Sequence, residues 1–256
     1  SGTGLFCEMK EPTNRGEQPM STAPKKVVLL DLDGTLTDSA PGILASVKET
    51  FKALHMPVPD AAELQRFVGP PIITSLKRNH VPDDQLDHGV DLYREFYGER
   101  EIFDDPNNPG CKVAGRYVNM VFDGIPQQLA ALRADGYYLA VATCKPEYQA
   151  VPICDRFGVT GMVDGIYGAS KDNSRLLKEQ VIEYCFDHIG FDRATDRALM
   201  VGDRWTDADG AKACNLDCLG CGWGYAEPGE LAEHGAYRVI DHIDELHDAV
   251  VEYFAD

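Results

Sequence analysis

Short apolar runs alternate with amphipathic stretches along most of the chain. The first run, VVLLDLD at residues 27–33, begins with four consecutive apolar residues, which is typical of a strand buried on both faces of a sheet. Five further strand-like runs follow: YYLAVAT, MVDGIYG, RALMVGD, LDCLGCGW and YRVI. Helical patterns lie between or after them, in GIPQQLAALRADG, residues 146–157, residues 174–189, residues 205–214, PGELAEHG and DHIDELHDAVVEYF. This alternation predicts the α/β class, with a doubly wound parallel sheet covered by helices on both faces.

Residues 41–122 interrupt the alternation. PGILASVKETFKAL begins at Pro41, a residue favoured at the start of a helix, and repeats apolar residues at helical spacing. DDQLDHGVDLYREFY has the same periodicity, whereas IFDDPNNPGCKVAGRY is rich in Pro, Asn and Gly and is predicted to be a loop. No convincing strand is found in this interval. We therefore expect an all-helical domain of residues 41–122, inserted into a core made of residues 26–40 and 123–256.

The N-terminal segment has the composition of a flexible tail. Residues 1–25 are polar, rich in Pro and Gly, and contain no apolar stretch of the kind that a secretory signal needs. Met20 is the expected native start. Eight cysteines are spread along the chain, and Cys218 and Cys221 form a CxxC, but a second pair at zinc-binding spacing is missing. Reduced thiols and a cytoplasmic location are therefore expected.

The net charge of the chain limits the kinds of molecule that it is expected to bind. The 256 residues carry a formal net charge of −18, so binding to nucleic acid, a polyanion, is not expected. No apolar run approaches the roughly 18 residues of a membrane span, so no membrane partner is expected either. An anionic substrate would need a metal ion or local basic residues to reverse the field at its site.

Polar residues stand where several of the predicted strands end, or close to those ends. They are Asp31, Asp33, Thr143, Lys178, Asp203 and Asp207. Ligand sites of open α/β sheets lie outside the carboxyl ends of the strands, so we expect these residues to converge at one edge of the sheet. Three aspartates at one edge would repel each other. Mg²⁺, which prefers carboxylate oxygens and water, would resolve that repulsion.

This combination has the components of phosphoryl chemistry. A carboxylate that faces a metal-bound phosphoryl group can attack phosphorus and form an acyl phosphate. A second carboxylate two residues away can protonate the leaving oxygen and then activate water. A hydroxyl and a lysine can hold the phosphoryl oxygens. Each residue type alone is more often a turn, packing or surface residue, so the prediction depends on the combination.

The stretches DLDGTLTDS, VATCKP and GDRWTDADGAKACN, together with Lys178, resemble the four motifs of the haloacid dehalogenase superfamily, in the same order and spacing. The resemblance implies a Rossmann-like core. It places the inserted helical segment where the superfamily has its cap domain.

The resemblance also implies a role for each candidate residue. Asp31 would be the nucleophile and Asp33 the general acid and base. Thr143 and Lys178 would bind phosphate, with Lys171 as the alternative for the lysine. The metal ligands that the resemblance implies are Asp31, Asp33 through its backbone carbonyl, Asp203 and Asp207.

The choice of reaction depends on Asp33, because the superfamily's dehalogenases work without metal and generally lack this second aspartate. The stretches RFVGPPIITSL, YREFY, VATCKP and GCGWGYAEPGEL resemble the phosphoglycolate phosphatase-like branch. That resemblance implies a Mg²⁺-dependent phosphatase acting on a small phosphorylated metabolite, with phosphoglycolate preferred. The protein is expected to be a monomer or homodimer. The alternatives are a 5′-nucleotidase or pyrophosphatase of the same branch, a phosphomutase, a 2-haloacid dehalogenase and a catalytically silent binding protein.

The inserted domain is expected to control substrate choice. Its Gly-Pro-Pro turn precedes a helix whose backbone donors and Arg78 could face the site, the alternative being a packing turn with a surface arginine. Lys145 is either a positive charge at the mouth of the site or a surface lysine. Trp205 either packs internally or lies near the cap. The segment 102–119 looks longer than in the branch, which is expected to alter substrate contacts from the cap.

Overall fold

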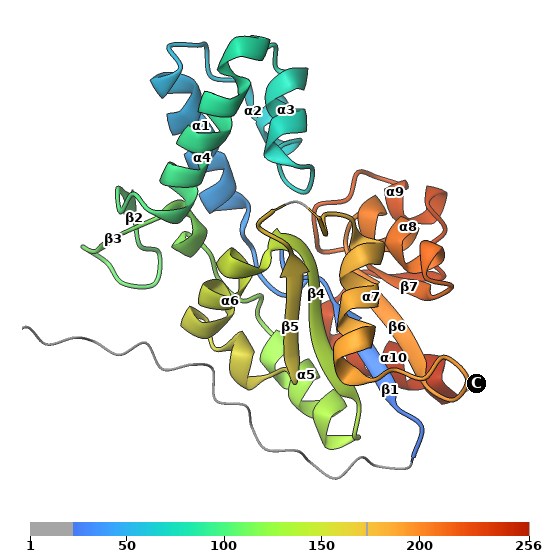
Figure 1. The fold of residues 1–256 in the computed structure, drawn as a ribbon. Helices are drawn as coiled ribbons and strands as arrows, with labels where there is room; N and C mark the ends of the chain where they lie inside the picture. The colour runs from blue at the N-terminus through green and yellow to red at the C-terminus, as the bar shows by residue number, and fades with distance from the viewer. Residues whose placement is uncertain (1–22, 173, 256) are drawn as a thin grey trace, which may run out of the picture.

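The computed structural model describes residues 23–172 and 174–255. It contains a parallel sheet of six strands in the order β5-β4-β1-β6-β7-β8 (Figure 1). The strands are β1 (Lys26–Leu30), β4 (Tyr138–Pro146), β5 (Gly165–Ala169), β6 (Arg197–Gly202), β7 (Asp217–Cys221) and β8 (Arg238–Ile240). β1 lies inside the sheet, where Val27 pairs with Tyr138 of β4 and Lys26 with Arg197 of β6. The continuous apolar run of β1 follows from this position, because both of its faces are covered.

Helices cover both faces of the sheet. Val28 and Leu30 of β1 pack in one cluster with side chains of α5 (Ile125–Ala134), α6 (Glu147–Arg156) and α10 (Leu246–Ala255). Val27 and Leu29 pack on the opposite face with α7 (Lys178–Ile189) and α8 (Trp205–Ala213). The short α9 (Glu230–Glu233) lies between β7 and β8 in the chain. The predicted fold class, a doubly wound parallel α/β sheet, is confirmed.

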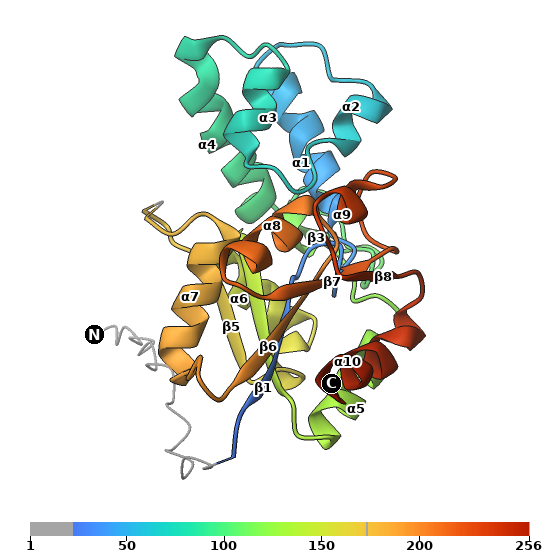
Figure 2. The same ribbon diagram turned by 90° about the vertical axis from the view of Figure 1, so that its right-hand side faces the viewer.

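Four helices form a separate body beyond the carboxyl ends of the strands (Figures 1 and 2). They are α1 (Ala40–Ala53), α2 (Ala61–Gln65), α3 (Ile72–Arg78) and α4 (Leu86–Gly98). Their apolar side chains make a hydrophobic cluster of their own, which includes Phe51, Leu76 and Tyr97. A helical insertion is therefore present, while the domain bounds 41–122 remain a prediction.

One prediction for this insertion is wrong. The stretch expected to be a loop contains two short antiparallel strands, β2 (Phe103–Asp104) and β3 (Lys112–Val113). The Pro, Asn and Gly residues that indicated a loop form the turn between them. Asp105 at this turn is buried and accepts a hydrogen bond from Arg156 of α6 at 2.7 Å. A contact with the core thus stabilises a hairpin that local sequence does not predict.

Other expectations concern the chain ends, the thiols and membranes. The predicted tail lies outside the described residues except at its end, where the backbone N–H of Lys25 donates to Asp196 at 2.7 Å. The seven cysteines of the described residues are free, and Cys218 and Cys221 are buried in clusters on opposite faces of the sheet. Among the described residues, no helix is both long enough and apolar enough to cross a membrane.

Candidate active site

The loop after β1 carries Asp31 and Asp33 to the carboxyl edge of the sheet. The backbone N–H of Asp31 donates to the carbonyl of Val201 at 2.9 Å, which continues the pairing between β1 and β6. Gly34 then turns the chain with φ = +83°, a conformation that favours glycine. A Cβ at Gly34 would lie 2.2 Å from Oδ2 of Asp203, so this glycine also makes room for a neighbouring carboxylate.

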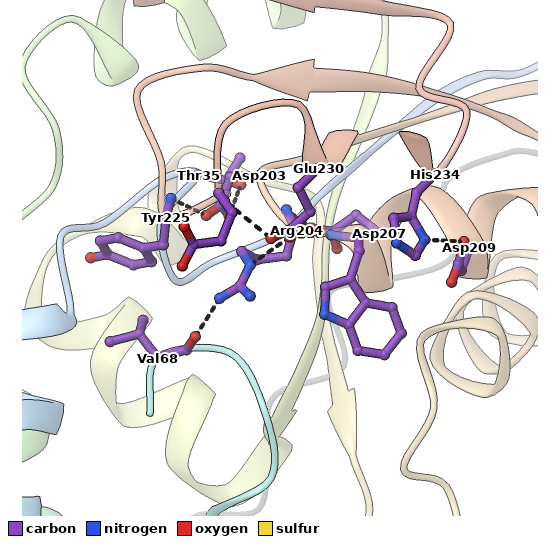
Figure 3. Close-up of polar contacts among 11 residues, drawn as sticks. Thr35, Val68, Asp203, Arg204, Asp207, Asp209, Tyr225, Glu230 and His234 are labelled. Atoms are coloured by element: carbon purple, nitrogen blue, oxygen red, sulfur yellow. Dashed lines mark hydrogen bonds and ion pairs between the residues drawn. The ribbon is translucent and has the colours of Figure 1, made fainter. Parts of the chain in front are cut away.

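Three carboxylates converge at this edge. Asp31, Asp203 and Asp207 are buried, and each places an oxygen within 4.8 Å of the others. Asp203 is held by the hydroxyl of Thr35, at 2.9 Å, and by the backbone N–H of Tyr225, at 2.8 Å (Figure 3). These are oxygen donors of the kind that hard divalent cations accept.

Lys178 lies among these carboxylates. It is the first residue of α7, and its side chain is 1% exposed. Its Nζ is 3.0 Å from Oδ1 of Asp31 and 2.8 Å from Oδ1 of Asp207, and it donates to the carbonyl of Ala142 at 2.7 Å. Lys171, the alternative, is exposed and lies 5.7 Å from the ring centre of Tyr148. The geometry therefore brings Lys178, rather than Lys171, to the aspartates.

The electrostatics of the cluster are those of crowded, desolvated acids. Burial raises the pKa of Asp31 to about 6, with a further contribution from the charge of Asp207 and an opposing one from Lys178. Burial also raises the pKa of Asp203 well above its usual range, and Asp207 and Asp31 add to the effect. For Lys178, burial alone would lower the pKa, but the charges of Asp207 and Asp31 outweigh it and the pKa is raised. A bound cation would relieve the mutual repulsion of the carboxylates.

Asp33 and Thr143 lie beside this cluster. Oδ2 of Asp33 is 2.9 Å from Nζ of Lys145, which also donates to the hydroxyl of Tyr97 at 2.6 Å. Thr143 is buried on β4, two residues beyond Val141, the partner of Leu30 in β1, and its hydroxyl accepts from the backbone N–H of Lys145 at 3.1 Å. Lys145 is therefore not a surface lysine: its side chain is 7% exposed.

Arg204 connects the core to the inserted helices (Figure 3). Its backbone N–H donates to Asp207 at 3.0 Å, and its Nε pairs with Glu230 at 2.8 Å. Its Nη1 donates to the carbonyl of Val68, in the turn before α3. Gly69 in that turn has φ = +106°, and a Cβ there would lie 2.7 Å from the same Nη1. One residue thus contacts both a site aspartate and the Gly-Pro-Pro turn.

Arg78 and Trp205 line a cleft of about 420 Å³ between the insertion and the core, together with Pro70 and Tyr225. Arg78 is already engaged within the insertion, because it donates to Glu63 at 2.6 Å and to the carbonyl of Arg66 at 3.0 Å. Trp205 is 39% exposed, so it is not an internal packing residue.

Comparison with known proteins identifies the family. The model of the family described as haloacid dehalogenase-like hydrolase matches residues 28–221. The chain belongs to this family. The predicted superfamily membership and the prediction that the protein is a hydrolase of the phosphatase type are therefore confirmed at the family level.

Several relatives of this hydrolase carry functional names. A 5′-nucleotidase of Pseudomonas aeruginosa is 36% identical over 208 residues, which cover 81% of this chain and 87% of that protein. Tyrosine-protein kinase PtkA of Mycobacterium tuberculosis is 34% identical over 253 residues, 98% of this chain and 80% of that protein. A phosphoglycolate phosphatase of Pseudomonas savastanoi is 25% identical over 238 residues, 90% of this chain and 81% of that protein. The crystal structure of a predicted phosphatase from Clostridium acetobutylicum is similar with a TM-score of 0.77 and 34% identity, covering 90% of this chain and all of the other.

Sequence reasoning missed several residues of the hydrolase that contact its candidate site. Thr35 lies within the first motif and Arg204 within the fourth, so both stood beside predicted site residues without being singled out. Tyr97 is the last residue of DDQLDHGVDLYREFY, whose periodicity predicts only an apolar packing face. Tyr225 follows the glycine-rich GCGWG. Its contact with Asp203 depends on the close approach of Gly224 to the Asp203 side chain, because a Cβ at Gly224 would lie 2.2 Å from the Cβ of Asp203.

Proposed function

We propose that this hydrolase is a Mg²⁺-dependent phosphatase that cleaves small phosphate monoesters through an aspartyl phosphate on Asp31. The observation that carries the proposal is the cluster of Asp31, Asp203 and Asp207, whose oxygens lie within 4.8 Å of one another while Lys178 bridges two of them. Buried carboxylates at such separations are costly unless cations compensate them. Binding of a metal ion would compensate this cost, and the same metal would attract a phosphoryl group.

In the proposed reaction, Asp31, Asp203, Asp207 and the backbone carbonyl of Asp33 would hold Mg²⁺, which when bound lowers the repulsion between carboxylates and phosphate. Asp31 attacks phosphorus while the bond from phosphorus to the leaving oxygen breaks. Asp33 gives its proton to that oxygen. Lys178 and Thr143 bind the phosphoryl oxygens and stabilise the charge that develops on them.

The second half of the reaction regenerates Asp31. Asp33, now a carboxylate, accepts a proton from a water molecule as its oxygen attacks the phosphorus of the aspartyl phosphate. The acyl–phosphate bond breaks, inorganic phosphate leaves, and the Asp31 carboxylate is restored. The same residue therefore acts first as acid and then as base.

The substrate we infer is a small phosphorylated metabolite that fits beneath the inserted helices, which act as a cap. The motif resemblance supports phosphoglycolate, whereas the 36% identity to a 5′-nucleotidase supports a nucleoside monophosphate. A second candidate function is transfer of the phosphoryl group to a tyrosine hydroxyl. It is supported by the 34% identity to PtkA over 98% of the chain, and would need only a hydroxyl in place of water.

The decisive variant is Asp31→Asn, which keeps the shape of the side chain but removes the attacking charge. We expect its kcat for p-nitrophenyl phosphate with Mg²⁺ to fall by at least ~10³-fold, and chelation to abolish the wild-type rate. Asp187→Asn, the same substitution at an exposed position of α7, is the matched control and should retain activity. Retention of a tenth of the wild-type kcat by Asp31→Asn would exclude the covalent route. Appearance of phosphotyrosine on a peptide, in place of free phosphate, would favour the transferase.

A further inference from the structure

Lys145 occupies an unusual place beside the candidate general acid. Its ammonium lies between Oδ2 of Asp33, at 2.9 Å, and the hydroxyl of Tyr97, at 2.6 Å, and also sits 4.7 Å from the centre of the Tyr97 ring. The Lys145 side chain is 7% exposed, and Tyr97 is 2% exposed. Burial and these two contacts hold the long Lys145 side chain in one conformation. The three residues therefore form one ordered unit, which we call the Tyr97–Lys145–Asp33 contact.

The two oxygens of Asp33 are in different environments. Oδ2 faces Lys145, whereas Oδ1 is buried and has no hydrogen-bond partner among the described residues. A buried acceptor without a donor is unfavourable, so a partner is expected from outside the chain. A group at the reacting centre, the leaving oxygen or the hydrolytic water, can provide that partner. The carboxyl group is thus held through one oxygen while the other remains available.

Tyr97 brings the inserted helices into this unit. It lies near the end of α4, and its ring stacks on Tyr93 with centroids 5.4 Å apart and planes at 8°. Lys145 and Asp33, in contrast, belong to the core, at the end of β4 and after β1. The position of α4 on the core therefore determines whether the ammonium of Lys145 has its second partner.

We propose that Lys145, held in place by Tyr97, is a positioning residue that orients Asp33 for proton transfer to the leaving group. The inference rests on the proposed function above and concerns its first step. As the ester bond from phosphorus breaks and the bond to Asp31 forms, the proton moves from Oδ1 of Asp33 to the leaving oxygen. Asp33 becomes a carboxylate, and its new negative charge forms next to a fixed ammonium, which stabilises the transition state of that transfer. Because Tyr97 lies on α4, this stabilisation depends on the position of α4 relative to the core.

The leaving group provides a test that a purely structural role would not satisfy. An alkoxide is a poor leaving group and needs the proton of Asp33, whereas p-nitrophenolate can depart without it. Because kcat/KM includes only the steps up to formation of the aspartyl phosphate, comparing the two classes isolates the acid step from the later hydrolysis. General acid catalysis typically raises the rate by ~10²–10⁴-fold. Asp33→Asn therefore gives the largest expected difference in kcat/KM loss between the alkyl phosphates and p-nitrophenyl phosphate.

The experiment measures kcat/KM of each variant for p-nitrophenyl phosphate, phosphoglycolate and adenosine 5′-monophosphate. We expect Lys145→Met to lose at least ~10-fold more activity on the alkyl phosphate that wild type prefers than on p-nitrophenyl phosphate. We expect Lys145→Arg to recover part of the difference, because it restores the cation. Tyr97→Phe, which removes one hydroxyl, should show the same bias at about 3- to 10-fold, the size expected for the loss of one typical hydrogen bond. Tyr237→Phe, the same substitution at a 44% exposed position just before β8, is the matched control and should show no bias between the two classes.

The possible outcomes distinguish the positioning role of Lys145 from the phosphatase mechanism itself. If Asp33→Asn shows the leaving-group bias while Lys145→Met and Tyr97→Phe lose equally on all three esters, the positioning role is wrong although the phosphatase mechanism stands. If Asp31→Asn leaves turnover intact, the proposed function itself is wrong. Tyr97→Phe is nearly isosteric, so it keeps the test valid even if Lys145→Met fails to fold.

Discussion

At the scale of single residues, the dominant constraint is the burial of three acids with one lysine. Burial and the charge of Asp207 give Asp31 a pKa of about 6, above its unfolded value of 3.8. Between these pH values the folded chain holds a proton that the unfolded chain has released. The stability that this group contributes without metal is therefore present below about pH 3.8 and is lost as the pH rises through about 6.

Binding of Mg²⁺ should show the opposite dependence, because the metal needs the ionised carboxylates. We expect the increase in Tm produced by saturating Mg²⁺ to be small at pH 5 and to grow as the pH rises through about 6. Thermal unfolding with Mg²⁺ or with chelator across this range measures it. Asp31→Asn removes one of the two carboxyl groups whose pKa is raised, the other being Asp203, and should weaken the pH dependence. A Tm increase of the same size at pH 5 and pH 7.5 in wild type would contradict the metal assignment.

At the scale of elements, the turn before α3 is joined to the start of α8 through Arg204. The Arg204 and Glu230 side chains are 13% and 10% exposed, so removing the guanidinium leaves a largely buried carboxylate and the Val68 carbonyl without this partner. We expect Arg204→Met to lower the free energy of unfolding by about 2–4 kcal/mol. We also expect its KM to rise more than its kcat falls, because the turn over the site loosens.

Urea unfolding and steady-state kinetics test this expectation. Arg94→Met is the matched control, since Arg94 and Asp91 form a 3.7 Å pair whose side chains are 51% and 69% exposed. An exposed pair of this kind contributes at most about 1 kcal/mol. Equal losses of stability in the two variants would show that the Arg204 contact does not hold the turn.

The elements also show what sequence can predict. The strands of the sheet were predictable because burial on both faces produces continuous apolar runs, and strand ends indicate where polar groups meet. The β2–β3 hairpin was not, because Asp105 and Arg156 stabilise it through a contact between distant segments. The burial of Lys145 was not predictable either, since a lysine after a threonine has no periodic signal and its two partners, Asp33 and Tyr97, lie on two other segments of the chain. The order of the motifs indicates which side chains lie close together. It does not indicate which carboxylate oxygen contacts Lys145 or Lys178, which depends on the three-dimensional structure.

At the scale of the whole molecule, an acidic surface and a helical cover both bear on substrate choice. The net charge of −18 repels long polyanions, and the insertion stands over the edge of the sheet where the carboxylates lie (Figure 2). We expect kcat/KM for phosphoglycolate or a nucleoside monophosphate to exceed that for a tyrosine phosphopeptide. A panel of these esters with pyrophosphate and sugar phosphates, followed by phosphate release, measures the order. A phosphopeptide in first place would contradict the covering role of the insertion. A nucleotide ahead of phosphoglycolate would change only the identity of the substrate.

The central position of β1 has a consequence for how the chain folds. β1, which precedes the proposed nucleophile Asp31, is synthesised early. The strands that pair with it come much later in the chain, from Tyr138 and from Arg197. The helices α1 to α4 make their contacts within a short stretch of sequence, so they can form while β1 is still unpaired. Pairing of β1 waits for late segments, which slows folding and leaves an apolar strand exposed in the meantime. A nascent chain that ends before Asp207 therefore cannot assemble the full set of carboxylates, so catalytic competence comes as one of the last events of folding.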